Sequence, residues 1–329
     1  MDQPIRIVSY NVRYFGHVAK GLASTRAGKR GIARALAGLE PLPDLICLQE
    51  VETNSIRSDI GWRRTRQDET QLESFMGYLG QAFHEGGLEM PYDALYFRAH
   101  NYKLGEISLY TTGLAILVNR FTLRVEDHNA DQPFGITYYR VARWKDRKQS
   151  RICAHLKVRD LGGRPFHVFN THLSLPTPFA REYWAIKDKM GWGHNQVQEV
   201  KRLASFIRQR AGDEPFVVCG DFNSQPASPV FDFMHRESGL VAPQLELGQI
   251  DLSQPRAFPT AGFLRLRMHL DHLFSNHKIR WTDLAGTFPF GAGGPFDGLS
   301  DHVPLIGRFE IAVPRGIGVG FEVDSRRAG

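Results

Sequence analysis

The feature that most constrains the fold is a set of short apolar runs, each followed by a polar residue able to hold a metal or a phosphate. The clearest run is Phe216-Val217-Val218-Cys219, which leads into Gly220-Asp221-Phe222-Asn223. Four consecutive apolar, largely β-prone residues predict a buried strand. Side chains two apart in extended chain point the same way, so Asp221 and Asn223 are expected to converge where this strand ends. Such ends often carry the site of an α/β protein.

The same pattern recurs along the chain. The polar residues concerned are Asn11, Glu50, His172, the pair Asp221 and Asn223, and the closing pair made by Asp271 and Ser300-Asp301-His302. Each has a plain structural alternative, such as a turn residue, a surface carboxylate or a hydrogen-bonded sheet histidine. These alternatives do not explain why all five places lie beside apolar runs. The recurrence therefore favours a shared site.

The order of the predicted elements indicates an α/β chain. A strand over 5–10, a helix over 26–39 and a strand over 44–49 form a βαβ-like opening. Three strands in series, over 136–144, 150–158 and 165–172, suggest an antiparallel part of a sheet. A helix over 195–210, with apolar residues at helical spacing, leads into the strand before Asp221. A further helix over 70–79 and strands over 113–119, 270–274 and 305–311 complete the pattern. A strand over 121–125 is expected to continue the sheet of 113–119 after a turn.

Composition adds bounds on class and compartment. The 329 residues are 42% hydrophobic and 23% charged, which is ordinary for a globular protein, and the net charge is +6. A modest positive charge favours an anionic partner or substrate. The three cysteines, Cys47, Cys153 and Cys219, lie in apolar runs and are expected to be reduced core thiols. No signal peptide or transmembrane segment is visible, so a cytoplasmic location is expected.

The chemistry that fits these residue types is hydrolysis of a phosphate ester. It needs an activated water, neutralisation of charge at phosphorus and help for the leaving oxygen. A hard cation held by Glu50, with Asn11 and Asp301 nearby, would supply the last two, and oxygen ligands favour Mg²⁺ or Mn²⁺. Asp271 could orient His302 as a base, and Asp221 could orient the water or protonate the leaving group. Asn223 and His172 could donate hydrogen bonds to phosphate oxygens.

The ordered motifs also carry a resemblance. They are Ser9-Tyr10-Asn11, Leu48-Gln49-Glu50, Asn170-Thr171-His172-Leu173, Gly220-Asp221-Phe222-Asn223-Ser224, Leu270-Asp271-His272 and Ser300-Asp301-His302-Val303-Pro304. In this order the set resembles the endonuclease/exonuclease/phosphatase superfamily, also called deoxyribonuclease-I-like. The resemblance implies a four-layer α/β sandwich, in which two mixed β-sheets pack face to face and helices flank them. It also implies a Mg²⁺-dependent phosphoesterase with the roles given above.

The resemblance covers residues 5 to 312, so we expect one catalytic domain over 1–313 and a peripheral tail over 314–329. Two departures stand out: His272 where many members have tyrosine, and no tryptophan over 264–269. The second lowers the case for DNA repair. Mono- versus diesterase preference, the number of metal ions and oligomeric state stay open, and no obligate protein partner is predicted.

The substrate stays open between classes. Basic residues over 140–151 and 63–66 favour a nucleic acid, since such stretches track a phosphate backbone. An aromatic insertion over 173–194 favours a phospholipid, as in a sphingomyelinase, or a small phosphoester. An inactive binding module that holds an acidic partner is the alternative of another class.

Overall fold

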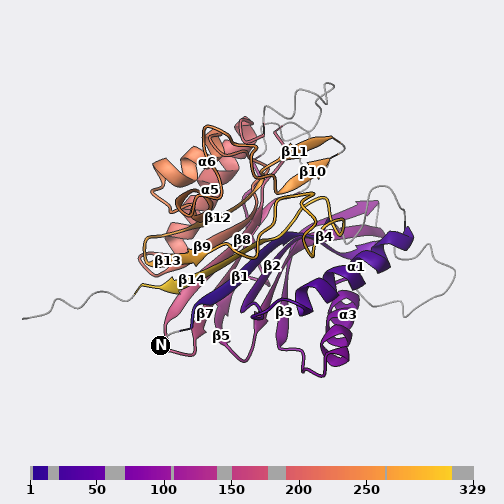
Figure 1. Cartoon of the computed structure of the whole chain (residues 1–329). Coiled ribbons are helices and arrows are strands. Elements are labelled where there is room, and N and C mark those ends of the chain that lie inside the picture. Colours follow the sequence, from indigo (N-terminus) through magenta and orange to yellow (C-terminus); the bar gives the residue numbers. More distant parts are fainter. Residues whose placement is uncertain are drawn as a thin grey trace, which may run out of the picture.

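The computed structural model describes residues 3–13, 22–55, 71–104, 107–138, 150–176, 190–263 and 265–312. Two six-stranded sheets dominate it, and helices cover their outer faces (Figure 1). Among the described residues, no helix combines the length and hydrophobicity needed to cross a membrane.

The first sheet contains the N-terminal strands and the C-terminal strand. Its order is β13-β14-β1-β2-β4-β3. The bounds are β1 Ile5–Asn11, β2 Leu45–Ser55, β3 Tyr92–Leu104, β4 Ile107–Asn119, β13 Ile279–Asp283 and β14 Leu305–Ile311. β1 and β2 are parallel, and β14 runs antiparallel to β1. The C-terminal end of β1 and the N-terminal end of β14 therefore lie side by side at the same end of the strands.

The second sheet has the order β12-β9-β8-β7-β5, and the short β6 pairs with β7. The bounds are β5 Leu123–His128, β6 Phe134–Gly135, β7 Ile152–Asp160, β8 Pro165–His172, β9 Phe216–Asp221 and β12 Asp271–Ser275. β8 and β9 are parallel, with His172 opposite Asp221. β12 is antiparallel to β9, with Asp271 opposite Asp221. The pairing thus brings three polar residues to one row.

The remaining elements are helices and one small hairpin. Their bounds are α1 Leu22–Ala37, α3 Gln71–Glu85, α5 His194–Ala211, α6 Pro229–Asp232, the π-helix η3 Phe233–Glu237, α7 Pro243–Glu246, and the paired strands β10 Ala261–Phe263 and β11 Leu266–Met268. In Figure 1, α1 and α3 cover the first sheet, and α5 and α6 cover the second.

The four layers follow from the alternation of side chains along each strand. In β2, Leu45 and Cys47 join the apolar core between the sheets, whereas Ile46 and Leu48 join the core shared with α1 and α3. In β9, Val217 faces the other sheet and Val218 faces the core under α5 and α6. Because both faces of these strands are buried, the sequence appears as a continuous apolar run. The sandwich predicted from the sequence is confirmed.

Most predicted elements are present with shifted ends. The first helix begins at Leu22 and ends at Ala37, and the helix predicted over 70–79 is α3. The βαβ opening is correct, since β1 and β2 are parallel and α1 lies between them in the chain. The three cysteines are free and buried, as expected.

Four predictions need correction or lie outside the described residues. The segment near 121–125 was expected to continue the sheet of β4, but β5 pairs with β7 in the second sheet. Residues 136–138 are not a strand, and 139–149 are outside the described part. β2 does not end at Glu50 but runs on to Ser55 through a register shift after Leu48. The 314–329 tail is outside the described residues, so the domain boundary stays a prediction.

Candidate active site

Asp221 lies at the centre of the polar side chains gathered at one edge of the sandwich. Its Oδ2 accepts a hydrogen bond from Asn11 Nδ2 at 2.9 Å. The same oxygen lies 3.5 Å from His172 Nε2 and 3.7 Å from His302 Nε2. These residues come from β1, β8, β9 and the segment before β14, so both sheets contribute. Burial is the main cause that raises the pKa of Asp221, to about 7.

Asn223 turns back toward Asp221 just after β9. Its φ of 48° is left-handed, a region that asparagine tolerates better than most residues. The backbone N–H of Asn223 donates to Asp221 Oδ1 at 2.8 Å, which fixes the carboxylate. The side-chain Nδ2 donates to Leu173 O at 2.9 Å and lies 3.1 Å from His172 Nε2. Asn223 and His172 therefore face each other across the parallel strands.

Asp271 and His302 form a buried pair. His302 Nδ1 lies 2.9 Å from Asp271 Oδ2, and the Thr260 hydroxyl donates to the same oxygen at 2.6 Å. Burial opposes protonation of His302, but the carboxylates of Asp271 and Asp221 outweigh it and raise the pKa of His302 to about 10. The pair leaves His302 Nε2 directed at the region of Asp221, which suits transfer of a proton there.

Glu50 lies on a bulge in β2, not at the end of the strand as the sequence indicated. Its φ is 55°, and the register between β2 and β4 shifts between Leu48 and Val51. Bulges redirect a side chain and are common beside active sites. The Glu50 Oε1 lies 3.8 Å from His172 Nε2, which places this carboxylate in the same cluster.

The oxygen atoms around Glu50 suit a hard cation. The Asn11 side chain hydrogen-bonds the Glu50 side chain. Burial is the main cause that raises the pKa of Glu50; the positive charge of Arg151 opposes this rise, and the negative charge of Asp301 adds to it. A divalent ion would stabilise the ionised form of the Glu50 carboxyl group, on which Asp301 and Asn11 also act. Arg13 pairs with Asp301 Oδ2 and supplies a positive charge at this point.

Asp271 and His302, the proposed proton-transfer pair, also belong to a second group of possible metal ligands. Candidate ligand atoms of Asp221, Asp271 and His302 lie within 4.8 Å of one another. However, Asp271 Oδ2 already accepts from Thr260 and pairs with His302 Nδ1. These bonds suit an orienting role for Asp271 better than a ligand role. Glu50, Asn11 and Asp301 therefore stay the predicted metal ligands, and Asp221, Asp271 and His302 are a second candidate group.

Sequence reasoning missed several residues that hold the cluster together. Thr260 supports Asp271, Arg13 pairs with Asp301, and the Ser300 hydroxyl donates to Asn11 O at 2.8 Å. Arg151 was placed in a basic stretch, yet its Nη1 lies 3.0 Å from His172 Nδ1. Nothing in the spacing of these residues marks them, because each contact joins segments far apart in the chain or depends on side-chain orientation.

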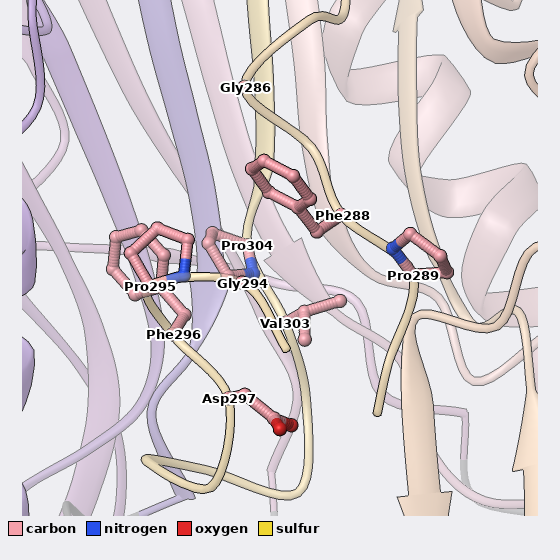
Figure 2. A pocket seen from close by; sticks show the side chains of 9 residues that line it. All are labelled: Gly286, Phe288, Pro289, Gly294, Pro295, Phe296, Asp297, Val303 and Pro304. Atoms are coloured by element: carbon pink, nitrogen blue, oxygen red, sulfur yellow. The ribbon is translucent and has the colours of Figure 1, made fainter. Parts of the chain in front are cut away.

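The described residues form a pocket at this edge and another beside the segment that precedes β14. One is lined by Glu50, His172 and Arg151, with Leu114 and Ile152 among its apolar walls. The other, in Figure 2, is formed by residues 286–297 with Val303 and Pro304, and its lining is glycine, proline and apolar side chains apart from Asp297. None of the predicted catalytic residues lines that second pocket, whereas Glu50 and His172 line the first.

Much of the predicted substrate surface lies outside the described residues. This holds for 63–66, for 140–148 and for Phe179, Tyr183 and Trp184 of the aromatic insertion. Within the described part, Met190 is buried with Ala261, Met268 and Leu270. Trp192 is 60% exposed.

Comparison with known proteins decides the family. The model of the Endonuclease/Exonuclease/phosphatase family matches residues 8–302. The chain belongs to this family. Its members hydrolyse phosphoester bonds and generally depend on a divalent metal, and this endonuclease/exonuclease/phosphatase protein is a hydrolase of that kind.

A curated relative shares part of the sequence. Nocturnin of Drosophila melanogaster is 34% identical over 83 residues, which is 25% of this chain and only 11% of the fly protein. The chain thus spans a small part of that relative's length.

Solved structures of this endonuclease/exonuclease/phosphatase fold match nearly the whole chain. The human Nocturnin catalytic domain with bound sulfate has a TM-score of 0.59 and 19% identity, covering 94% of this chain and 95% of its own. A Bacteroides vulgatus family protein gives 0.58 and 16%, covering 94% and 100%. D. rerio TDP2 with a single-strand DNA product gives 0.56 and 14%, covering 94% and 100%. These identities establish a shared fold.

Proposed function

We propose that this protein is a Mg²⁺-dependent phosphodiesterase that cleaves a nucleic acid. The observation that carries the proposal is the convergence on Asp221 Oδ2 of Asn11 Nδ2, His172 Nε2 and His302 Nε2, at 2.9, 3.5 and 3.7 Å. These groups surround one point with donors and a titratable carboxylate, as hydrolysis of a phosphate ester requires.

Glu50, Asn11 and Asp301 are the residues we propose to hold the ion, with Mn²⁺ able to replace Mg²⁺. When bound, the ion supplies charge neutralisation at the phosphate and at the leaving oxygen. The oxygen-only donor set supports Mg²⁺ over zinc, which prefers nitrogen and sulfur.

The other residues have separate roles in this proposal. Asp271 orients His302, so that His302 exchanges a proton with the attacking water at Nε2. Asp221 orients that water or protonates the leaving group. Asn223 Nδ2 and His172 donate hydrogen bonds to phosphate oxygens, which stabilises the charge that develops in the transition state.

Two features support a nucleic acid as substrate. The net charge of +6 and the basic stretches near 63–66 and 140–151 suit a polyanion. Among the structures with this fold, the human Nocturnin domain carries a sulfate and the TDP2 structure carries a single-strand DNA product. The free, buried cysteines also support a reducing, cytoplasmic location.

A phospholipid or small phosphoester is the second candidate. Leu175 and Trp192, on either side of the 177–189 segment, are 47% and 60% exposed. Exposed apolar side chains of this size near a site can contact a lipid surface. We keep this candidate for that reason, and we set aside the inactive binding module because the chain belongs to a family of hydrolases.

The test is a substrate panel with Mg²⁺ and with Mn²⁺. It contains single-stranded DNA, plasmid DNA, RNA, sphingomyelin vesicles and chromogenic phosphate mono- and diesters. We expect cleavage of a nucleic acid that a chelator abolishes, that falls steeply with salt, and that drops about 10²–10⁴-fold in His302→Asn. The exposed His277→Asn is the matched control. Turnover confined to sphingomyelin or small esters would reject the nucleic-acid assignment.

A further inference from the structure

Arg151 lies at the entry to β7 with its backbone held in place. Its carbonyl accepts a hydrogen bond from Ile136 N at 2.9 Å, and its N–H donates to the Thr137 hydroxyl. Its side chain lines the same pocket as Glu50 and His172. Because the Arg151 backbone is fixed, its guanidinium can present its donors to the pocket in only a limited range of directions.

The contact between Arg151 and His172 restricts the hydrogen positions on the imidazole. Arg151 Nη1 lies 3.0 Å from His172 Nδ1. A guanidinium can only donate, so Nδ1 must be the acceptor. A neutral imidazole carries one hydrogen, and that hydrogen is then on Nε2.

The surroundings of Nε2 agree with this tautomer. Two carboxylate oxygens face it, Asp221 Oδ2 at 3.5 Å and Glu50 Oε1 at 3.8 Å. Among the described residues, Asn223 Nδ2, at 3.1 Å, is the neighbour that would prefer a bare Nε2. If Nε2 were bare, the hydrogen of the neutral imidazole would be on Nδ1 and would point at the N–H groups of the guanidinium. A charged donor forms the stronger hydrogen bond, so Arg151 decides the tautomer.

We propose that Arg151 is a positioning residue that holds His172 as the neutral Nε2–H tautomer, so that His172 acts on the substrate as a donor and not as a base. The role in catalysis rests on the proposed function, because it assumes that a phosphate oxygen lies near Nε2. The Nε of Arg151 is buried and has no hydrogen-bond partner among the described residues. This N–H adds to the positive charge available to an anion in the pocket.

The first test reads the tautomer directly and needs no substrate. Long-range ¹H–¹⁵N spectra of the full chain with ¹⁵N-labelled histidine distinguish Nδ1–H from Nε2–H, and His172→Gln assigns the signal. We expect Nε2–H in the wild type, a change toward Nδ1–H in Arg151→Met, and retention of Nε2–H in Arg151→Lys, which keeps a charged donor. Arg124→Met, which removes an exposed arginine of β5, should change nothing.

The second test measures turnover of whichever ester the substrate panel identifies. Arg151→Met should lower kcat by about 10–100-fold, the usual cost of losing a group that orients an active-site histidine. Arg151→Lys should recover part of this loss.

The outcomes separate the inference from the proposed function. Nδ1–H in the wild type, or an unchanged tautomer in Arg151→Met, overturns the role of Arg151 even if the protein is an active nuclease. A tautomer change in a protein that cleaves no phosphoester supports the positioning by Arg151 and rejects the proposed function. Folding of each variant is verified by its amide spectrum, and if Arg151→Met unfolds, Arg151→Gln takes its place with the same expected tautomer change.

Discussion

Gln49 and Asn170 hydrogen-bond to each other across the two sheets, immediately beneath the active site. Gln49 Nε2 donates to Asn170 Oδ1 at 2.8 Å, and Asn170 Nδ2 donates to Leu48 O at 3.0 Å. Both side chains are fully buried. Gln49 precedes Glu50, and Asn170 lies two residues before His172. This pair therefore ties the proposed metal ligand on one sheet to the histidine proposed to bind phosphate on the other.

Replacing Asn170 by leucine should weaken both stability and activity. The change removes the shortest hydrogen bond of the buried Gln49 amide, which keeps Ser9 Oγ and Cys47 O at 3.2 Å, and it also removes the donor to Leu48 O. Together these losses should cost about 1–3 kcal/mol in the free energy of unfolding. Urea denaturation measures that loss, and the exposed Gln209→Leu should stay within about 0.5 kcal/mol of wild type. Equal stabilities for the two variants would mean that the bridge between the sheets contributes nothing.

Thr260→Val should impair catalysis through Asp271. The Thr260 hydroxyl donates to Asp271 Oδ2 and accepts from the backbone N–H groups of Leu270 and Asp271 at 3.0 and 3.1 Å. Without it, Asp271 no longer holds His302 in one orientation, so kcat should fall about 10–100-fold. Thr260→Ser keeps the hydroxyl and serves as the matched control. A valine variant as active as the serine variant would contradict this support role.

The sequence predicted which distant side chains meet at the site better than it predicted the residues that hold those side chains in place. Asn11, His172 and Asp221 end strands that are parallel to a neighbour, and such ends meet at one edge. The bulge that places Glu50 could not be predicted, because a register shift depends on the partner strand. Thr260 and Arg151 likewise gain their contacts only from tertiary packing. The crossing of β5 to the second sheet was missed because a short turn usually joins neighbouring strands.

Removing the Glu50 charge should weaken the response to metal. We expect Glu50→Gln to raise the Mg²⁺ concentration for half-maximal activity by more than about tenfold, since a neutral amide is a poorer ligand for a hard cation. Mg²⁺ titration of turnover after chelator treatment gives this value. The exposed Glu237→Gln should titrate like the wild type. An unchanged Mg²⁺ concentration for half-maximal activity in Glu50→Gln would mean that other residues hold the metal.

Gly220→Ala should disrupt the strand pair that carries His172 and Asp221. Gly220 has a φ of 146°, and an added Cβ would lie 2.0 Å from Thr171 O, a backbone atom of the adjacent strand. The strands must separate to admit it, so we expect a loss of more than about 2 kcal/mol in unfolding free energy. Gly135→Ala, with no atom within 4 Å of the new Cβ, is the control. Similar melting temperatures for the two variants would contradict the close approach.

A buried histidine pair on β7 and β8 makes stability depend on pH. His155 Nε2 lies 2.8 Å from His167 Nδ1, and His167 Nε2 lies 2.7 Å from Glu214 Oε2. The other charged groups that act on the pair are Lys157, Arg210 and Asp127. The pKa of His155 is lowered to about 3, chiefly by burial and in part by His167 and Arg210. His155 is therefore neutral in the folded protein.

This depressed pKa predicts loss of stability in mild acid. Between pH 6.5 and 3 the unfolded chain binds a proton at position 155 that the folded protein excludes, so the free energy of unfolding falls as the pH falls. Relative to His155→Phe, the wild type should lose about 2 kcal/mol more between pH 7 and pH 5. Urea denaturation at the two pH values measures the difference, and His128→Phe, on the exposed end of β5, should follow the wild type. Parallel pH dependence in wild type and His155→Phe would show that this imidazole is not the group that makes the fold sensitive to acid.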